Sequence, residues 1–110
     1  MNTQEENEQI EPAPELMIPW SIVIFKEGDQ WMAMGLERLT FWWADTIEEA
    51  FTGLIKAMYW QVHMDRGCGQ VPFSLVPRAK ERYWNFYRSA VKSTELQMPL
   101  PLTGEVRVLV

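Results

Sequence analysis

Residues 31–58, WMAMGLERLTFWWADTIEEAFTGLIKAM, decide the fold of this chain. An apolar run predicts a β-strand over 31–36, and the β-branched and aromatic run TFWWA predicts another over 40–44. Thr46 followed by Glu49 has the spacing of a capping box, which places a helix start there. Apolar residues then recur at steps of three and four, so we expect an amphipathic helix that ends at the glycines beside Cys68.

The flanking sequence extends this core in both directions. Upstream, WSIVIF at 20–25 predicts a strand, and Glu27, Gly28 and Asp29 supply the turn of a β-hairpin. Downstream, a proline-led apolar pattern predicts a second helix over 77–92 with Trp84 off its apolar face, and residues 105–110 offer a fourth strand. The predicted fold class is α+β, a three-stranded antiparallel sheet with a main helix packed on one face and a second helix, β-β-β-α-α(-β).

The domain organisation follows from length and composition. With 110 residues and 47% hydrophobic side chains, the chain has room for one domain with a core. Residues 1–15 hold five Glu, no Lys or Arg, and almost no apolar side chains. We therefore expect a flexible acidic tail over 1–17 and a single domain over 18–110.

Charge and cysteine content narrow the function classes. The net charge of −5 argues against a generic nucleic-acid binder, because neutralising phosphates needs a surplus of Lys and Arg. A single cysteine, Cys68, forms no internal disulfide, and no apolar run is long enough to cross a bilayer. The tail lacks the basic start of a secretory signal. A cytoplasmic protein without membrane spans or cofactors is the resulting prediction.

One local basic segment keeps a second hypothesis open. Residues 78–92 carry five basic side chains against a single acidic one, Glu81. This segment is either the solvated side of an amphipathic helix or a contact for nucleic acid. The candidate nucleic-acid contacts are Arg78, Lys80, Arg82, Arg88 and Lys92.

The polar residues do not form a recognisable catalytic set. A two-metal nuclease needs converging carboxylates, one of them in the middle of the first strand, and WSIVIF has none. Anions are favoured at a helix start, so capping explains the acidic residues there. His63 lies five residues before Cys68, but no oxyanion or nucleophile motif accompanies the pair. We therefore expect no catalytic and no metal-binding residues.

Aromatic side chains are the distinctive feature of the sequence, with six Trp, five Phe and three Tyr. Successive strand residues point to opposite faces, so Trp42 faces away from Phe41 and Trp43, and both sheet faces are apolar. The second helix, a twin subunit or a partner protein must cover the face that the main helix leaves open. An uncovered face favours a homodimer. The candidate partner-binding residues are Trp31, Phe41, Trp42, Trp43 and Trp84, with Trp42 at the centre.

Residues 22–58, IVIFKEGDQWMAMGLERLTFWWADTIEEAFTGLIKAM, resemble the HicB-like antitoxin core, a truncated ribonuclease-H-like domain. The matching positions are Glu27, Gly28 and Asp29 in the hairpin turn, Ala44, Asp45 and Thr46 at the junction, and Glu48, Glu49 and Ala50 in the first helical turn. Phe41, Trp42 and Trp43 stand where the family often has smaller or polar residues.

The resemblance implies a non-catalytic module that binds and neutralises another protein. Family antitoxins usually carry a DNA-binding segment after this core, whereas this sequence offers one helix and a proline-rich turn, so it resembles a stand-alone bacterial or phage member. The implied partner is a toxin or, for a phage protein, a host defence component.

Overall fold

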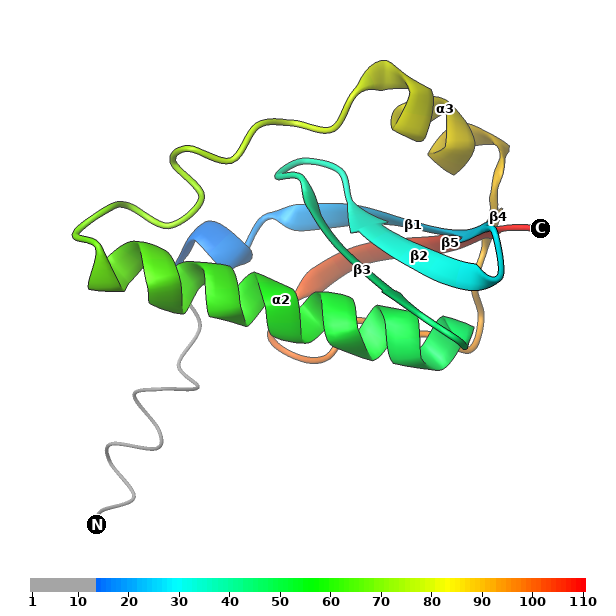
Figure 1. The fold of residues 1–110 in the computed structure, drawn as a ribbon, viewed down its shortest axis with the longest axis horizontal. Helices are drawn as coiled ribbons and strands as arrows, with labels where there is room; N and C mark the ends of the chain where they lie inside the picture. Colours follow the sequence, from blue (N-terminus) through cyan, green and yellow to red (C-terminus); the bar gives the residue numbers. More distant parts are fainter. Residues whose placement is uncertain (1–13) are drawn as a thin grey trace, which may run out of the picture.

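The computed structural model describes residues 14–110, which form one five-stranded mixed sheet with helices on both faces (Figure 1). The elements in chain order are η1 (Pro14–Leu16), β1 (Pro19–Glu27), β2 (Gln30–Gly35), β3 (Thr40–Ala44), α2 (Ile47–Gly67), α3 (Glu81–Ser89), β4 (Val91–Lys92) and β5 (Thr103–Leu109). The strand order across the sheet is β3-β2-β1-β5-β4. The α+β class is as predicted.

The predicted hairpin is confirmed. β1 and β2 pair antiparallel with Glu27 opposite Gln30, which leaves a turn of two residues. Gly28 occupies its first position with φ 63°, a left-handed conformation that glycine adopts without strain. β3 has the bounds expected from TFWWA and pairs antiparallel with β2.

The sheet is larger than the three antiparallel strands predicted. β5 lies between β1 and β4 and runs parallel to β1, with Val106 opposite Ile22 (Figure 1). The fourth strand offered at 105–110 therefore exists at 103–109, but in the sheet interior. Strand propensity locates a strand without identifying its neighbours, so the parallel pairing of the first and last strands was not predictable from it.

The main helix begins as its capping residues predict. The Glu49 amide donates a hydrogen bond to Thr46 Oγ1 over 3.1 Å, and the Thr46 hydroxyl donates to the Glu49 carboxylate over 3.0 Å. α2 ends where Cys68 donates its amide to the carbonyls of Met64 and Asp65. Its buried residues repeat at helical spacing: Ala50, Phe51, Leu54, Met58 and Val62.

The second helix is shorter than the predicted 77–92. The Leu39 amide donates to the Pro77 carbonyl, and the Ala79 amide donates to the Leu36 carbonyl. These bonds hold residues 77–79 extended along the β2–β3 connection, so α3 starts only at Glu81. At its other end Ala90 is already extended and leads into β4.

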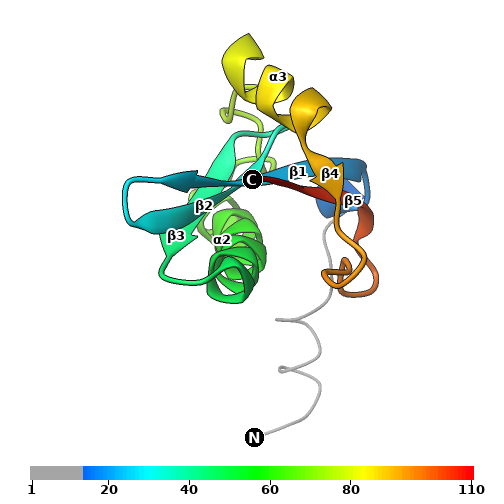
Figure 2. The same ribbon diagram turned by 90° about the vertical axis from the view of Figure 1, so that its right-hand side faces the viewer.

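The two helices lie on opposite faces of the sheet, each over its own apolar core (Figure 2). Ile22, Ile24 and Ala33 belong to the α2 core, whereas Val23 and Phe25 point into the α3 core. Of the three alternatives for the second face, the second helix covers the part over β1 and β5, with which α3 makes its contacts.

The folded part begins earlier than residue 18. Leu16 is fully buried, and its carbonyl accepts a hydrogen bond from Trp20 Nε1 over 3.1 Å. Residues 14–17 thus belong to the domain, because η1 places an apolar side chain in the α2 core. Most of the predicted tail, residues 1–13, lies outside the described residues.

Candidate functional site

β3 is an edge strand, because it stands first in the sheet order and β2 is its neighbour. The two-residue turn makes Glu27 and Gln30 a hydrogen-bonded pair, and such pairs alternate along an antiparallel ladder. By this alternation Thr40, Trp42 and Ala44 direct their amides and carbonyls to β2. The backbone groups of Phe41 and Trp43 consequently point outward, away from the sheet.

Phe41 and Trp43 lie on the same face as α3, opposite Met34 and Met32 of the α3 core. Their rings stack with centroids 5.6 Å apart and an interplanar angle of 11°. Nevertheless, 44% of Phe41 and 51% of Trp43 remain exposed to solvent. α3 packs on β1 and β5, toward the edge of the sheet that is farther from β3 (Figure 2). Phe41 and Trp43 therefore form the part of the α3-side face of the sheet that α3 leaves open.

Trp42 points to the α2 side, opposite Ala33 of the α2 core. Its indole rests on Gly53, where an added Cβ would clash with Trp42 Cδ1. Half of the side chain, 50%, remains exposed. Trp42 therefore packs partly on its own helix, and the open sheet face is centred on Phe41 and Trp43 instead of on Trp42 as predicted.

Hollows flank these aromatic residues on both sides. One of about 350 Å³ is lined by Phe41, Trp42 and Trp43. A second, of about 200 Å³, lies beside Trp43, and its lining residues are Glu27, Gln30, Met32 and Trp43. A third, of about 330 Å³, adjoins Trp42 on α2, and its lining residues are Trp42, Glu48, Glu49, Thr52, Gly53 and Lys56. The edge thus offers concave surface with both apolar and acidic walls.

The other two candidate tryptophans are more enclosed. Trp31 is partly buried against the α2 core, with Lys26 Nζ 5.3 Å from its ring centroid. Trp84 is the buried residue of α3, only 9% exposed, and the Arg78 guanidinium lies 3.9 Å from its ring centroid. The prediction that Trp84 lies off the apolar face was wrong: Trp84 belongs to the buried part of the α3 core, and Tyr83, Phe86 and Tyr87 are only partly buried around it.

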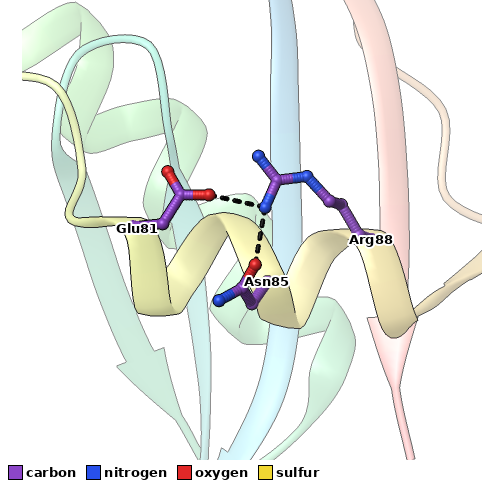
Figure 3. A network of polar contacts seen from close by, with 3 residues as sticks. All are labelled: Glu81, Asn85 and Arg88. Carbon is purple, nitrogen blue, oxygen red and sulfur yellow. Dashed lines mark hydrogen bonds and ion pairs between the residues drawn. The ribbon is translucent and has the colours of Figure 1, made fainter.

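Three of the five basic residues of the α3 region contact other groups of the domain. Arg88 forms an ion pair with Glu81 at 2.7 Å and donates to Asn85 at 2.6 Å (Figure 3). Arg82 lies over the rings of Tyr83 and Phe86. Arg78, Arg82 and Arg88 thus contact groups of their own domain, and all five candidate nucleic-acid contacts, Lys80 and Lys92 included, have exposed side chains.

Arg107 of β5 adds a cation to this region that the basic segment did not reveal. Its guanidinium lies 4.4 Å from the Tyr87 ring centroid and donates to the Tyr87 carbonyl over 3.2 Å. The hydrogen bond that Arg107 donates to the Glu105 carboxylate raises the pKa of Arg107 above its ordinary value. This arginine too is engaged within the domain.

The acidic residues serve the local structure. Asp45 accepts a hydrogen bond from Gln30 Nε2 over 3.3 Å, and Glu49 caps α2 with Thr46. His63 lies beside Trp60, 5.7 Å between ring centroids, and Cys68 is the exposed residue that caps α2. Within residues 14–110, no three histidine, cysteine or acidic side chains gather in an arrangement that could hold a metal ion.

Sequence reasoning missed Gly53 and Lys56 as parts of this surface. Gly53 is an isolated glycine inside the α2 pattern, where it costs about 1 kcal/mol of helix stability relative to alanine. Such a residue usually has a packing reason, and here the reason is the Trp42 ring. The glycine was therefore the available signal.

Comparisons of the chain with models of known protein families, with curated proteins and with solved structures gave no match. The resemblance to the HicB-like core stays a prediction. Between residues 14 and 110, no helix combines the length and apolar character that crossing a bilayer demands.

Proposed function

We propose that this chain is a non-catalytic, cytoplasmic protein-binding module of HicB-like type that neutralises or regulates a partner protein. The partner is a toxin if the module acts as an antitoxin, or a host defence component if it is a phage-encoded inhibitor. The observation that carries the proposal is the aromatic edge, defined as Phe41, Trp42 and Trp43 of β3. These side chains stay about half exposed on a strand with an unpaired outer side.

The size of this surface suits a protein contact. Aromatic side chains bury roughly 200 Å² each, so the half-exposed residues of the aromatic edge leave about 300 Å² open. Covering that area would contribute roughly 7 kcal/mol before the costs of association. Tryptophan is also the residue type most enriched at energetic hot spots.

The test compares two exposed tryptophans in the complex that the full-length protein forms with a specific copurifying protein. Trp43→Ala should weaken that complex by about 2 kcal/mol or more, roughly 30-fold in Kd, because it removes a ring from the centre of the proposed surface. The matched control is Trp60→Ala, since Trp60 is 62% exposed but lies on α2. Isothermal titration calorimetry measures both affinities. An unchanged affinity for Trp43→Ala would remove the aromatic edge from the proposal.

A further inference from the structure

We propose that two copies of this chain pair antiparallel along β3 across a two-fold axis, which joins their sheets into one continuous sheet. The inference rests on the proposed function, because it concerns the same aromatic edge and names the second copy as its first occupant. The two copies would then present a doubled aromatic face to the partner protein.

The free edge is bounded at both ends. The outward Leu39 amide is already bonded to the Pro77 carbonyl, so pairing with another strand stops at Thr40. At the other end the chain bends at residues 45–46 before α2 begins. The open edge is thus the five residues of β3, with Trp42 at the midpoint.

An antiparallel second copy centred on Trp42 satisfies the outward backbone groups. Phe41 of one copy then lies opposite Trp43 of the other, and these are the residues whose amides and carbonyls point outward. Each such pair exchanges two hydrogen bonds, and the arrangement forms two of these pairs. The stacked Phe41 and Trp43 rings continue across the axis as cross-strand aromatic pairs, which stabilise neighbouring strands.

The charges around β3 favour a second copy over an unrelated strand. Arg38 precedes Trp42 by four residues and Asp45 follows it by three, so the two-fold places Arg38 of each copy at the same end of the paired strands as Asp45 of the other. On α2, Glu49 precedes Gly53 by four residues and Lys56 follows it by three. Because Gly53 holds the Trp42 ring, the same axis brings Glu49 toward Lys56 of the second copy. Both pairs are attractive, as a self-complementary interface requires.

The area of contact extends beyond β3. The aromatic edges of two copies expose roughly 600 Å² in total, against about 1,600 Å² for an interface of standard size. The α2 surface must therefore take part. Its hollow of about 330 Å³ beside Trp42 and Gly53 is open and adjoins the axis. That hollow can receive the Trp42 indole of the second copy.

The dimer completes the partner-binding face. Phe41 and Trp43 of both copies fall on the side of α3, together with Met32. The four open strands, β2 and β3 of each copy, then form a floor between the two α3 helices. The hollow of about 200 Å³ beside Trp43 opens on this floor. A single copy supplies only half of it.

Multi-angle light scattering on the full-length protein tests the association. The expected mass is twice 12.9 kDa, falling toward one copy as the protein is diluted. Trp42→Lys places a positive charge on the axis next to the same charge of the second copy. The repulsion between the two charges should weaken self-association about 100-fold or more. Val91→Lys is the matched control, because Val91 is 72% exposed on the opposite edge strand β4. A wild-type protein that is monomeric at near-millimolar concentration overturns the proposal, as does a Val91→Lys monomer beside a Trp42→Lys dimer.

Cysteine crosslinking tests the register without changing the aromatic edge. In a Cys68→Ser background, Thr40→Cys and Ala44→Cys together should form disulfide-linked dimers, because Thr40 lies opposite Ala44 of the second copy. Such non-hydrogen-bonded pairs have Cα atoms about 4.5 Å apart, within disulfide reach. Each single cysteine variant should give no dimer band, since equal positions lie far apart. Dimer bands from a single variant, or none from the double variant of a dimeric protein, overturn this register.

The two proposals fail in different ways. A monomeric protein that loses its partner when Trp43 is replaced by alanine overturns the dimer and supports the proposed function. A dimer whose partner affinity is unaffected by Trp43→Ala supports the self-association and overturns the proposed surface. Light scattering and calorimetry on the same preparations separate these results.

Discussion

One face of the sheet carries two groups of aromatic side chains, the rings of α3 and the Phe41 and Trp43 rings of β3, which differ in how far the domain covers them. In the α3 cluster, defined as Tyr83, Trp84, Phe86 and Tyr87, arginines of the domain cover the rings at 3.9–5.8 Å from their centroids. Within residues 14–110, no Lys or Arg stands over a ring of the aromatic edge. The same residue types complete the fold in one place and stay available for contact in the other.

Geometry explains the difference. A helix is about 10 Å wide and neighbouring strands lie about 4.8 Å apart, so one helix covers two or three strands. α3 has nine residues and packs on β1 and β5, toward the middle of the sheet. β3 lies two strands away from β1 at the edge. Its α3-side rings are therefore beyond the reach of the helix that covers their neighbours.

The largest expected effect is on folding stability, and it should separate the two groups. Trp84→Ala should lower the free energy of unfolding by about 3–5 kcal/mol, because it removes a buried ring and leaves a cavity. Trp43→Ala should lower it by less than about 1 kcal/mol, since half of that ring is already in water. Urea unfolding followed by circular dichroism measures both. Equal losses would break the distinction between the two groups.

Trp84→Phe refines this comparison. The Trp84 Nε1 atom is buried and has no hydrogen-bond partner among the described residues. A phenyl ring therefore keeps much of the apolar packing and loses no hydrogen bond, so the cost should be clearly below that of alanine. A cost as large as that of alanine would show that the indole nitrogen has a partner in solution.

A smaller effect on folding stability is expected at Gly53, the residue on which the Trp42 ring packs. Gly53→Ala improves helix propensity by about 1 kcal/mol, but the new methyl group meets the Trp42 ring, and such overpacking costs about 1–3 kcal/mol. The net result should be a loss of about 1 kcal/mol. In a Trp42→Ala background the same change should become stabilising by about 1 kcal/mol. A double-mutant cycle from urea unfolding measures the reversal, and an unchanged sign would contradict the contact.

The local elements were predictable because their signals are local. The turn at Gly28, the cap at Thr46 and the strand TFWWA are determined by neighbours within a few residues. The position of β5 and the start of α3 depend on contacts with β1 and with Leu36, which are remote in sequence. No periodicity encodes such partners, so these parts of the fold could not be predicted.

The candidate surface was predictable by residue type and not by orientation. The doubled tryptophan identified β3 as aromatic on both faces, because successive strand residues point to opposite faces, and both rings are half exposed. Which ring faced α2 depended on the pairing register with β2, and that register placed Trp42 on Gly53. Trp84 was misassigned because the apolar spacing alone did not show which of the aromatic residues of α3 is buried against the sheet, and the buried one is Trp84.

The smallest expected effect concerns nucleic acid, which the alternative function assigns to the α3 region. Binding needs Lys and Arg side chains that are free to neutralise phosphates, and affinity that depends on them falls steeply between 50 and 200 mM salt. Arg78, Arg82 and Arg88 are exposed, but they already contact aromatic rings or Glu81, so binding a phosphate would compete with these contacts. Fluorescence anisotropy with a labelled single-stranded oligonucleotide should therefore show no binding at 50 mM salt. If binding appears, the slope of log K against log salt concentration should be measured for the wild type and for Arg82→Gln. A slope that is shallower by about 0.7 in Arg82→Gln would show that the α3 cluster is a functional surface, and the contrast with the aromatic edge would fail.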